Sequence, residues 1–158
     1  MTTLPSIDPL NHGLKRAQEL MESPTFKRDS AQDASWHIPF AELIIAVDEL
    51  LIQARQRGQQ VEFIDAVGVH GKIQDITSLI VWMRSSLPPR RDDLPTQLQH
   101  HRLNRYFDQG TGYFANGCFF TTDYSDELAF FIDDQRIYLE HHIGRLIQEV
   151  EAYKPEEK

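Results

Sequence analysis

The chain has 158 residues, a net charge of −8 and a single cysteine. About 150 residues can bury a hydrophobic core, so we expect one globular domain over residues 1–158. Cys118 cannot form an internal disulfide, which excludes a disulfide-framed secreted fold. The longest apolar runs have five residues, whereas a membrane-spanning helix needs about 20. Because the N-terminus also lacks the pattern of a signal peptide, we expect a cytoplasmic protein with no membrane segment.

Helical periodicity predicts four helices before residue 108. The clearest covers residues 39–57, where Phe40, Leu43 and Val47 start an apolar stripe and Gly58 ends the helix. The others are expected at 9–21, 72–87 and 95–107. Residues 59–70 suit either a helix or a buried strand. A loop is expected at 22–35 and a disordered tail at 154–158.

A β-hairpin is predicted at about residues 112–121. Asn116-Gly117 separates two short aromatic segments, 113–115 and 118–120. Asn-Gly between apolar runs is the strongest short-range signal of a hairpin turn, because both residues tolerate positive φ.

Residues 126–153 allow two interpretations. At 100° per residue, most apolar side chains fall on one helical face, with Phe130 and Ile137 as exceptions. Alternatively, strands at 127–132 and 137–140 would flank a turn at Asp133-Asp134. One long helix accounts for more of these residues than two strands do, so the pattern favours the helix. The predicted fold is therefore mainly α, with four to five helices in a bundle-like array and one hairpin before a long C-terminal helix.

Two histidine pairs, His100-His101 and His141-His142, are the first candidates for metal chemistry. Neighbours on a helix point about 100° apart, so each pair offers one ligand to a given ion, and metal sites need three or four. His100, His101 and His142 would be the ligands if a metal were bound. The missing ligand spacing favours no metal, and no cofactor is predicted.

Arg136 and His141 have the R-x4-H spacing, which resembles the catalytic signature of HEPN ribonucleases. That resemblance implies a helical, dimeric protein whose arginine and histidine cleave RNA. An ordinary helical ion pair between Arg136 and Glu140 explains the same arginine without catalysis. Arg136 and His141 are the catalytic candidates of the sequence, although the balance favours a role other than catalysis.

Aromatic residues crowd into 106–131 more densely than one face of a hairpin can bury. Either the C-terminal helix covers them or they form an interface, where aromatic side chains are enriched. The candidate interface residues are Tyr113, Phe114, Phe119, Phe120 and Phe130.

The sequence therefore predicts a small interaction or regulatory module, homodimeric or bound to another protein. One alternative is a histidine-dependent enzyme, either a metal-binding helical protein or a HEPN-like ribonuclease. Another is an acidic antitoxin or immunity-type protein that neutralises a basic partner, because residues 123–158 hold ten acids and four bases. The acidic balance disfavours nucleic acid as a partner.

Overall fold

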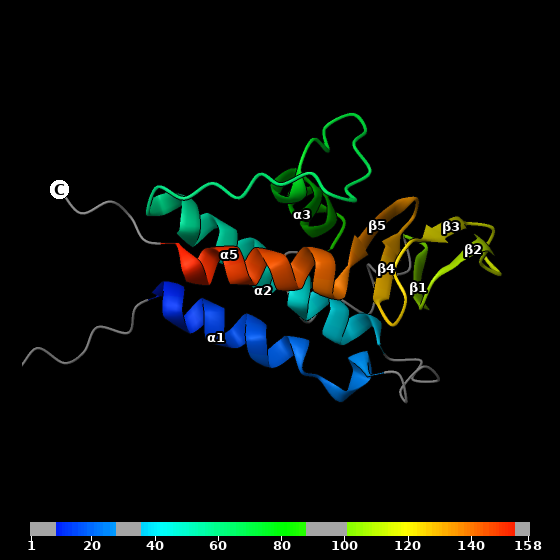
Figure 1. Ribbon diagram of the computed structural model, residues 1–158, viewed down its shortest axis with the longest axis horizontal. Helices are drawn as coiled ribbons and strands as arrows, with labels where there is room; N and C mark the ends of the chain where they lie inside the picture. The colour runs from blue at the N-terminus through cyan, green and yellow to red at the C-terminus, as the bar shows by residue number, and fades with distance from the viewer. Residues whose placement is uncertain (1–8, 28–35, 88–100, 154–158) are drawn as a thin grey trace, which may run out of the picture.

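A computed structural model describes residues 9–27, 36–87 and 101–153. These residues form four α-helices, five β-strands and two short helices of other types (Figure 1). The α-helices are α1 (Pro9–Met21), α2 (His37–Gln56), α3 (Ile76–Ser85) and α5 (Arg145–Ala152). The strands are β1 (Leu103–Phe107), β2 (Gly110–Tyr113), β3 (Phe119–Thr122), β4 (Leu128–Ile132) and β5 (Gln135–Tyr138). A 3-10 turn, η1 (Pro24–Phe26), follows α1, and a π-helix, η5 (Leu139–Gly144), precedes α5.

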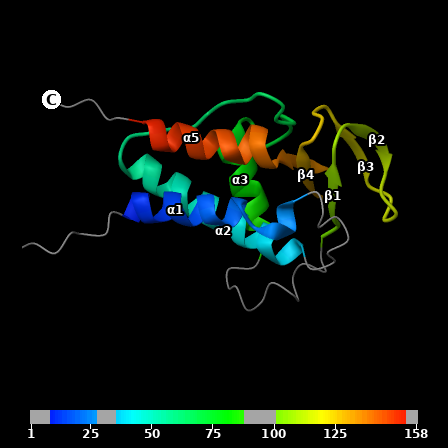
Figure 2. The ribbon, with the colours of Figure 1, turned by 60° about the horizontal axis from the view of Figure 1, so that its bottom comes forward.

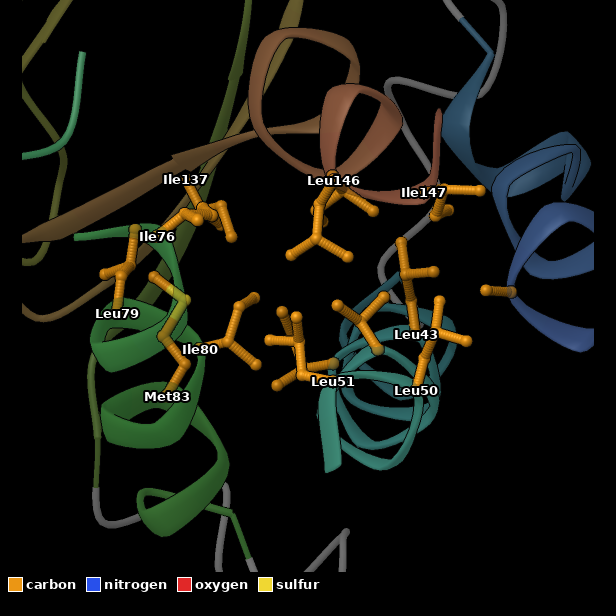
Figure 3. Close-up of a cluster of buried hydrophobic side chains, with 14 of the residues drawn as sticks. Leu43, Leu50, Leu51, Ile76, Leu79, Ile80, Met83, Ile137, Leu146 and Ile147 are labelled. Carbon is orange, nitrogen blue, oxygen red and sulfur yellow. The ribbon is translucent and has the colours of Figure 1, made fainter. Parts of the chain in front are cut away.

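The helices occupy one end of the molecule and the strands the other. Helices α1, α2 and α5 lie side by side, and α3 crosses them steeply (Figures 1 and 2). Helix α2 is central because its buried residues lie on most of its circumference, from Phe40 to Ala54. Figure 3 shows Leu51 of α2 facing Ile80 of α3 across the core, and Leu43 on the other side of α2, below Ile147 of α5. None of the helices in the described residues is both long and apolar enough to cross a membrane.

Helix α3 begins at a capping box. The Asp75 carboxylate accepts a hydrogen bond from the Ser78 backbone N–H at 2.8 Å, and the Ser78 hydroxyl accepts one from the Asp75 N–H at 2.9 Å. This reciprocal arrangement satisfies two backbone donors that the first helical turn leaves unpaired. The helix therefore starts at Ile76, later than the expected residue 72.

Three antiparallel strands form a sheet in the order β1-β4-β5. All five residues of the central strand β4 are buried. Phe130 of β4 pairs with Ile137 of β5, and both side chains are completely buried. The turn between these strands places Asp133 at φ 52°, in the left-handed region that aspartate tolerates better than most residues.

The hairpin β2–β3 leaves the sheet between β1 and β4. Gly117 has φ +92° in its turn, and the Phe114 N–H donates to the Cys118 carbonyl at 2.8 Å. On one face, Phe120 packs against Phe114 and Tyr106, with ring centroids 4.5 and 4.4 Å away. The expected hairpin at 112–121 is thus present, with strand bounds of 110–113 and 119–122.

The prediction of a helical bundle with one hairpin is wrong. Residues 103–107 form strand β1 instead of the end of a helix, and 126–153 contain strands β4 and β5 before a shorter helix. A strand buried on both faces is a continuous apolar run, so it does not show the alternation that identifies a half-buried strand. The strand interpretation of 127–132 and 137–140, which the pattern disfavoured, is the better description.

Residues 59–70 form neither a regular helix nor a strand within the described residues, apart from a single bridge between His70 and Ile73. The expected loop at 22–35 contains the 3-10 turn η1. Its part at 28–35, the expected helical residues 95–100 and the expected tail at 154–158 lie outside the described residues.

Candidate functional site

The candidate site lies where strand β5 passes into the π-helix η5, which carries both His141 and His142. π-helices account for well under 1% of residues and occur often at functional sites. Here the wide turn directs two neighbouring histidines to different surroundings. His142 is completely buried, whereas the side chain of His141 is 48% exposed.

Glu127 holds one nitrogen of the His141 ring. Its carboxylate is 3% exposed, and its Oε2 atom contacts His141 Nδ1. Because a carboxylate only accepts hydrogen bonds, Nδ1 carries the hydrogen and the neutral ring keeps its lone pair on Nε2. Nε2 has no hydrogen-bond partner within the described ranges, and His141 lines a surface pocket. The pair thus presents an oriented imidazole with one basic nitrogen available.

The other oxygen of Glu127, Oε1, caps the start of the C-terminal helix. Oε1 accepts hydrogen bonds from the backbone N–H groups of Glu140 at 2.5 Å and His141 at 3.1 Å. These donors belong to the first turn of the C-terminal helix, where a negative charge is also favourable. Helix capping therefore explains Oε1 and the burial of the charge, but it leaves the contact between Oε2 and the imidazole unexplained.

A turn before β4 places Glu127. Asp126 has φ 57°, and its N–H donates to the Asp108 carboxylate at 3.0 Å. The Asp108 N–H donates in turn to the Glu127 carbonyl at 3.0 Å. This turn returns the chain from the hairpin to the sheet and brings Glu127 to the start of η5.

Tyr124 covers one face of the His141 ring. The two rings stack with centroids 3.5 Å apart and planes 9° apart. Tyr124 also contacts Tyr138 edge-on at 4.8 Å, and the Tyr138 hydroxyl accepts a hydrogen bond from the Asp123 N–H at 3.0 Å. Burial raises the pKa of Tyr138 above its usual value. The imidazole is thus fixed in plane by Tyr124 and in rotation by Glu127.

The pocket beside His141 has a volume of about 450 Å³. Its lining residues are Asp65, Tyr124, Glu140, His141, Arg145 and Gln148. This volume is within the range of small-molecule sites.

Arg145 is engaged on three sides. It donates to Asp65 at 2.5 Å and to Glu149 at 2.8 Å, and its guanidinium carbon lies 3.9 Å from the centroid of the Phe63 ring. The hydrogen bond that Arg145 donates to Asp65 is the main reason that the pKa of Arg145 is raised. The arginine therefore joins the 59–70 segment to α5.

His142 has a structural role. Its Nδ1 accepts a hydrogen bond from the Tyr138 N–H at 2.9 Å, so Nε2 carries the hydrogen and donates to the Asp65 carbonyl at 3.0 Å. Burial lowers the pKa of His142 to about 4. A histidine that is neutral and doubly hydrogen-bonded has no lone pair left for a metal.

Arg136 and His141, the two catalytic candidates from the sequence, do not share a helix. Arg136 lies on β5, where it donates to the carbonyls of Thr121 at 2.6 Å and Ala66 at 3.1 Å. Its guanidinium also covers the Tyr138 ring at 4.7 Å. It ties β5 to β3 and to the 59–70 segment. Among the described residues it has no hydrogen bond or ion pair with His141 or Glu140, so the helical arrangement implied by the HEPN resemblance is absent.

His101, another metal candidate, lies at the turn between β4 and β5, whereas η5 follows the opposite end of β5. His101 contacts Asp133 through Nδ1 at 2.9 Å, and His100 lies outside the described residues. Burial disfavours the charged form of Asp133, but hydrogen bonds from His101 and the Arg102 N–H outweigh it and lower the pKa of that carboxyl. No cluster of three His, Cys, Asp or Glu side chains suited to a metal occurs in the part of the chain that is described.

The candidate interface residues divide into three groups. Phe130 is completely buried in the core, 4.4 Å from the Phe40 ring, so it cannot belong to an interface. Phe120 is buried and Phe114 half-buried within the second aromatic cluster. Tyr113 and Phe119 are 74% and 49% exposed and face each other across the hairpin at 5.4 Å.

Sequence reasoning missed Glu127, Tyr124 and Asp65. Glu127 was placed on the same helix as His141, where its carboxylate could not have reached that ring. Buried glutamate is the signal that only a folded structure provides, since acids are almost never fully buried without a partner. No protein-family model matches this chain, and no curated protein or solved structure is significantly similar to it.

Proposed function

We propose that the protein is a hydrolytic enzyme that uses His141 as its general base. The observation that supports this proposal is the contact of the buried Glu127 carboxylate with Nδ1 of a half-exposed imidazole, whose Nε2 is left to the pocket. A carboxylate that orients a histidine in this way fixes its tautomer and stabilises the imidazolium that forms during reaction.

The proposed step transfers one proton. His141 Nε2 accepts a proton from a water molecule while the water oxygen attacks an ester or amide carbonyl in the pocket. Glu127 stays ionised and stabilises the positive charge of the ring. The imidazolium then gives the proton to the leaving oxygen or nitrogen as its bond to the carbonyl carbon breaks, so the products are an acid and an alcohol or amine and the enzyme ends as it began.

A panel of chromogenic esters and amides tests the proposal. We expect hydrolysis of at least one class, with kcat/KM lowered about 100-fold or more in His141→Ala. Glu127→Gln should lose about tenfold or more, because the orienting charge is removed. His70→Ala is the matched control, since His70 is exposed and does not line the pocket. The proposal is wrong if no class is hydrolysed, or if His141→Ala is as active as the unchanged protein.

A second measurement tests the orientation of the His141 ring by Glu127 independently of any catalytic activity. Long-range proton–nitrogen correlation spectra at pH 9, where an imidazole is neutral, should show His141 with its hydrogen on Nδ1. Glu127→Gln should lose this preference. A hydrogen on Nε2 in the unchanged protein would contradict the role given to Glu127.

The interaction module expected from the sequence is the second candidate function. Tyr113 and Phe119 support it, because two exposed aromatic rings stand on a hairpin whose other face is anchored by Phe120. Rigid aromatic side chains of this kind often dominate binding energy. We propose a second copy of the chain as the first partner to test. Sedimentation should show a dimer that the double variant Tyr113→Ser/Phe119→Ser dissociates, and a monomer at all concentrations would contradict homodimerisation.

A further inference from the structure

The charges around the pocket are unequally compensated. Asp65 and Glu140 contribute two negative charges to its lining and Arg145 one positive charge. Arg145 is neutralised by its bonds to Asp65 at 2.5 Å and Glu149 at 2.8 Å. Behind His141 lies the further negative charge of Glu127. The pocket therefore has an excess of negative charge, and the net charge of −8 adds to it.

The carboxylate of Glu140 is the group left uncompensated. It has no hydrogen bond or ion pair among residues 9–27, 36–87 and 101–153, although its backbone N–H is bound by Glu127. Its Oε2 atom lies 3.1 Å from the place where a Cβ at Gly144 would stand. Because Gly144 has no side chain, the carboxylate can lie over that residue. Gly144 itself does not line the pocket, whereas Glu140 does.

Two aromatic rings line the same pocket. Tyr124 and His141 both line it, and their rings are stacked at 3.5 Å. The stacked imidazole covers one face of the Tyr124 ring, so a cation would contact the opposite face. The face of a tyrosine ring attracts cations, and quaternary ammonium groups are bound in proteins by such surfaces. A phosphate or carboxylate would meet Glu140 and Asp65 without a free cationic partner, since Arg145 is engaged on three sides.

We infer that this pocket binds the ammonium group of a small cationic substrate, with Glu140 as its counter-charge and Tyr124 as its aromatic contact. The inference rests on the proposed function, because it names the class of ester or amide that the water activated by His141 would attack. Glu140 is then a specificity-determining residue, and it takes no part in proton transfer.

Tetramethylammonium is the probe, and binding is followed by the Cε1–H resonance of His141. Sodium chloride is replaced stepwise by tetramethylammonium chloride at constant ionic strength, and inorganic phosphate is titrated separately. We expect saturable binding of tetramethylammonium and no saturable shift with phosphate. Glu140→Gln should weaken binding about fivefold or more, the size expected for losing one charge contact.

Glu49→Gln is the matched control, since it removes the same charge from the exposed side of α2, away from this pocket. Its binding should stay within about twofold of the unchanged protein. The inference is overturned if phosphate binds and tetramethylammonium does not, or if Glu140→Gln binds tetramethylammonium as tightly as the unchanged protein. If tetramethylammonium binds but no His141-dependent hydrolysis is found, the proposed function alone is contradicted. If hydrolysis depends on His141 but tetramethylammonium does not bind, the inferred substrate class alone is contradicted.

Discussion

The backbone N–H of Tyr138 donates a 2.9 Å hydrogen bond to Nδ1 of His142, four residues later in the chain. Strand β5 ends at Tyr138, so this bond ties the last strand to the first turn of η5. The same ring reaches the Asp65 carbonyl through Nε2. A single neutral imidazole thus joins the sheet, the C-terminal helix and the 59–70 segment.

Stability should fall in mildly acidic solution because of this ring. The pKa of His142 is lowered to about 4 in the folded protein, from an unfolded value of 6.5. As the pH falls below 6.5 the unfolded chain takes up the proton first, so the contribution of His142 is complete above 6.5 and is lost between 6.5 and 4. The shift corresponds to about 3 kcal/mol. Urea denaturation across this range measures it.

His142→Asn is the control for that pH dependence. The asparagine amide oxygen can accept from the Tyr138 N–H, but the side chain does not titrate. The slope of unfolding free energy against pH between 6.5 and 4 should therefore be smaller in the variant. Equal slopes would show that other groups cause the acid sensitivity.

Replacing Glu127 should lower stability as well as activity. Glu127→Gln keeps one acceptor oxygen but removes the buried charge at the start of the C-terminal helix. We expect the free energy of unfolding to fall by about 1–2 kcal/mol. Glu62→Gln, at an exposed position, should change it by no more than about 0.5 kcal/mol. Equal stability of the two variants would contradict the capping role.

Replacing Phe130 of β4 and Phe119 of β3 should have very different effects on stability. Phe130 is enclosed by Phe40, Phe26 and Trp36, with ring centroids 4.4, 5.4 and 5.8 Å away. Phe130→Ala should destabilise the protein by about 3–5 kcal/mol. Phe119→Ala, at a half-exposed ring, should cost much less, about 1 kcal/mol or below. Thermal denaturation of the pair distinguishes a core residue from a surface residue, and similar melting temperatures would contradict this assignment.

The cap of α3 provides a prediction away from the site. Asp75→Ala removes the acceptor for the Ser78 N–H and should cost about 1 kcal/mol. Asp75→Asn keeps an acceptor and should recover most of that loss. Chemical denaturation of the two variants checks this, and an Asp75→Ala protein as stable as the unchanged one would rule out the capping box as a source of stability.

Local patterns were sufficient for α2 and for the hairpin. The apolar stripe from Phe40 placed α2 within two residues of its observed bounds, because a long helix determines its own periodicity. Asn116-Gly117 placed the hairpin turn, where Gly117 has a positive φ. Both signals come from residues close together in the sequence.

The C-terminal part could not be obtained in this way. Phe130 and Ile137 were the two residues that did not fit the helical face, and the structure pairs them directly across β4 and β5. Strands buried on both faces lack the alternation that would have identified them. The contact between Glu127 and His141 depends on this pairing, so the candidate site could not be predicted before the strands were known.

The hairpin excursion has a consequence for how the pocket can change. Phe107 and Leu128 are paired neighbours, so the chain between them leaves and returns at one point of the sheet. Insertions or deletions in that stretch can therefore be absorbed without shifting the core. Tyr124 lies inside the stretch, whereas Glu127 lies at its closing end, next to β4, and His141 beyond it. Evolution or design can accordingly change the part of the pocket around Tyr124, the proposed ligand contact, while Glu127 and His141 stay in place.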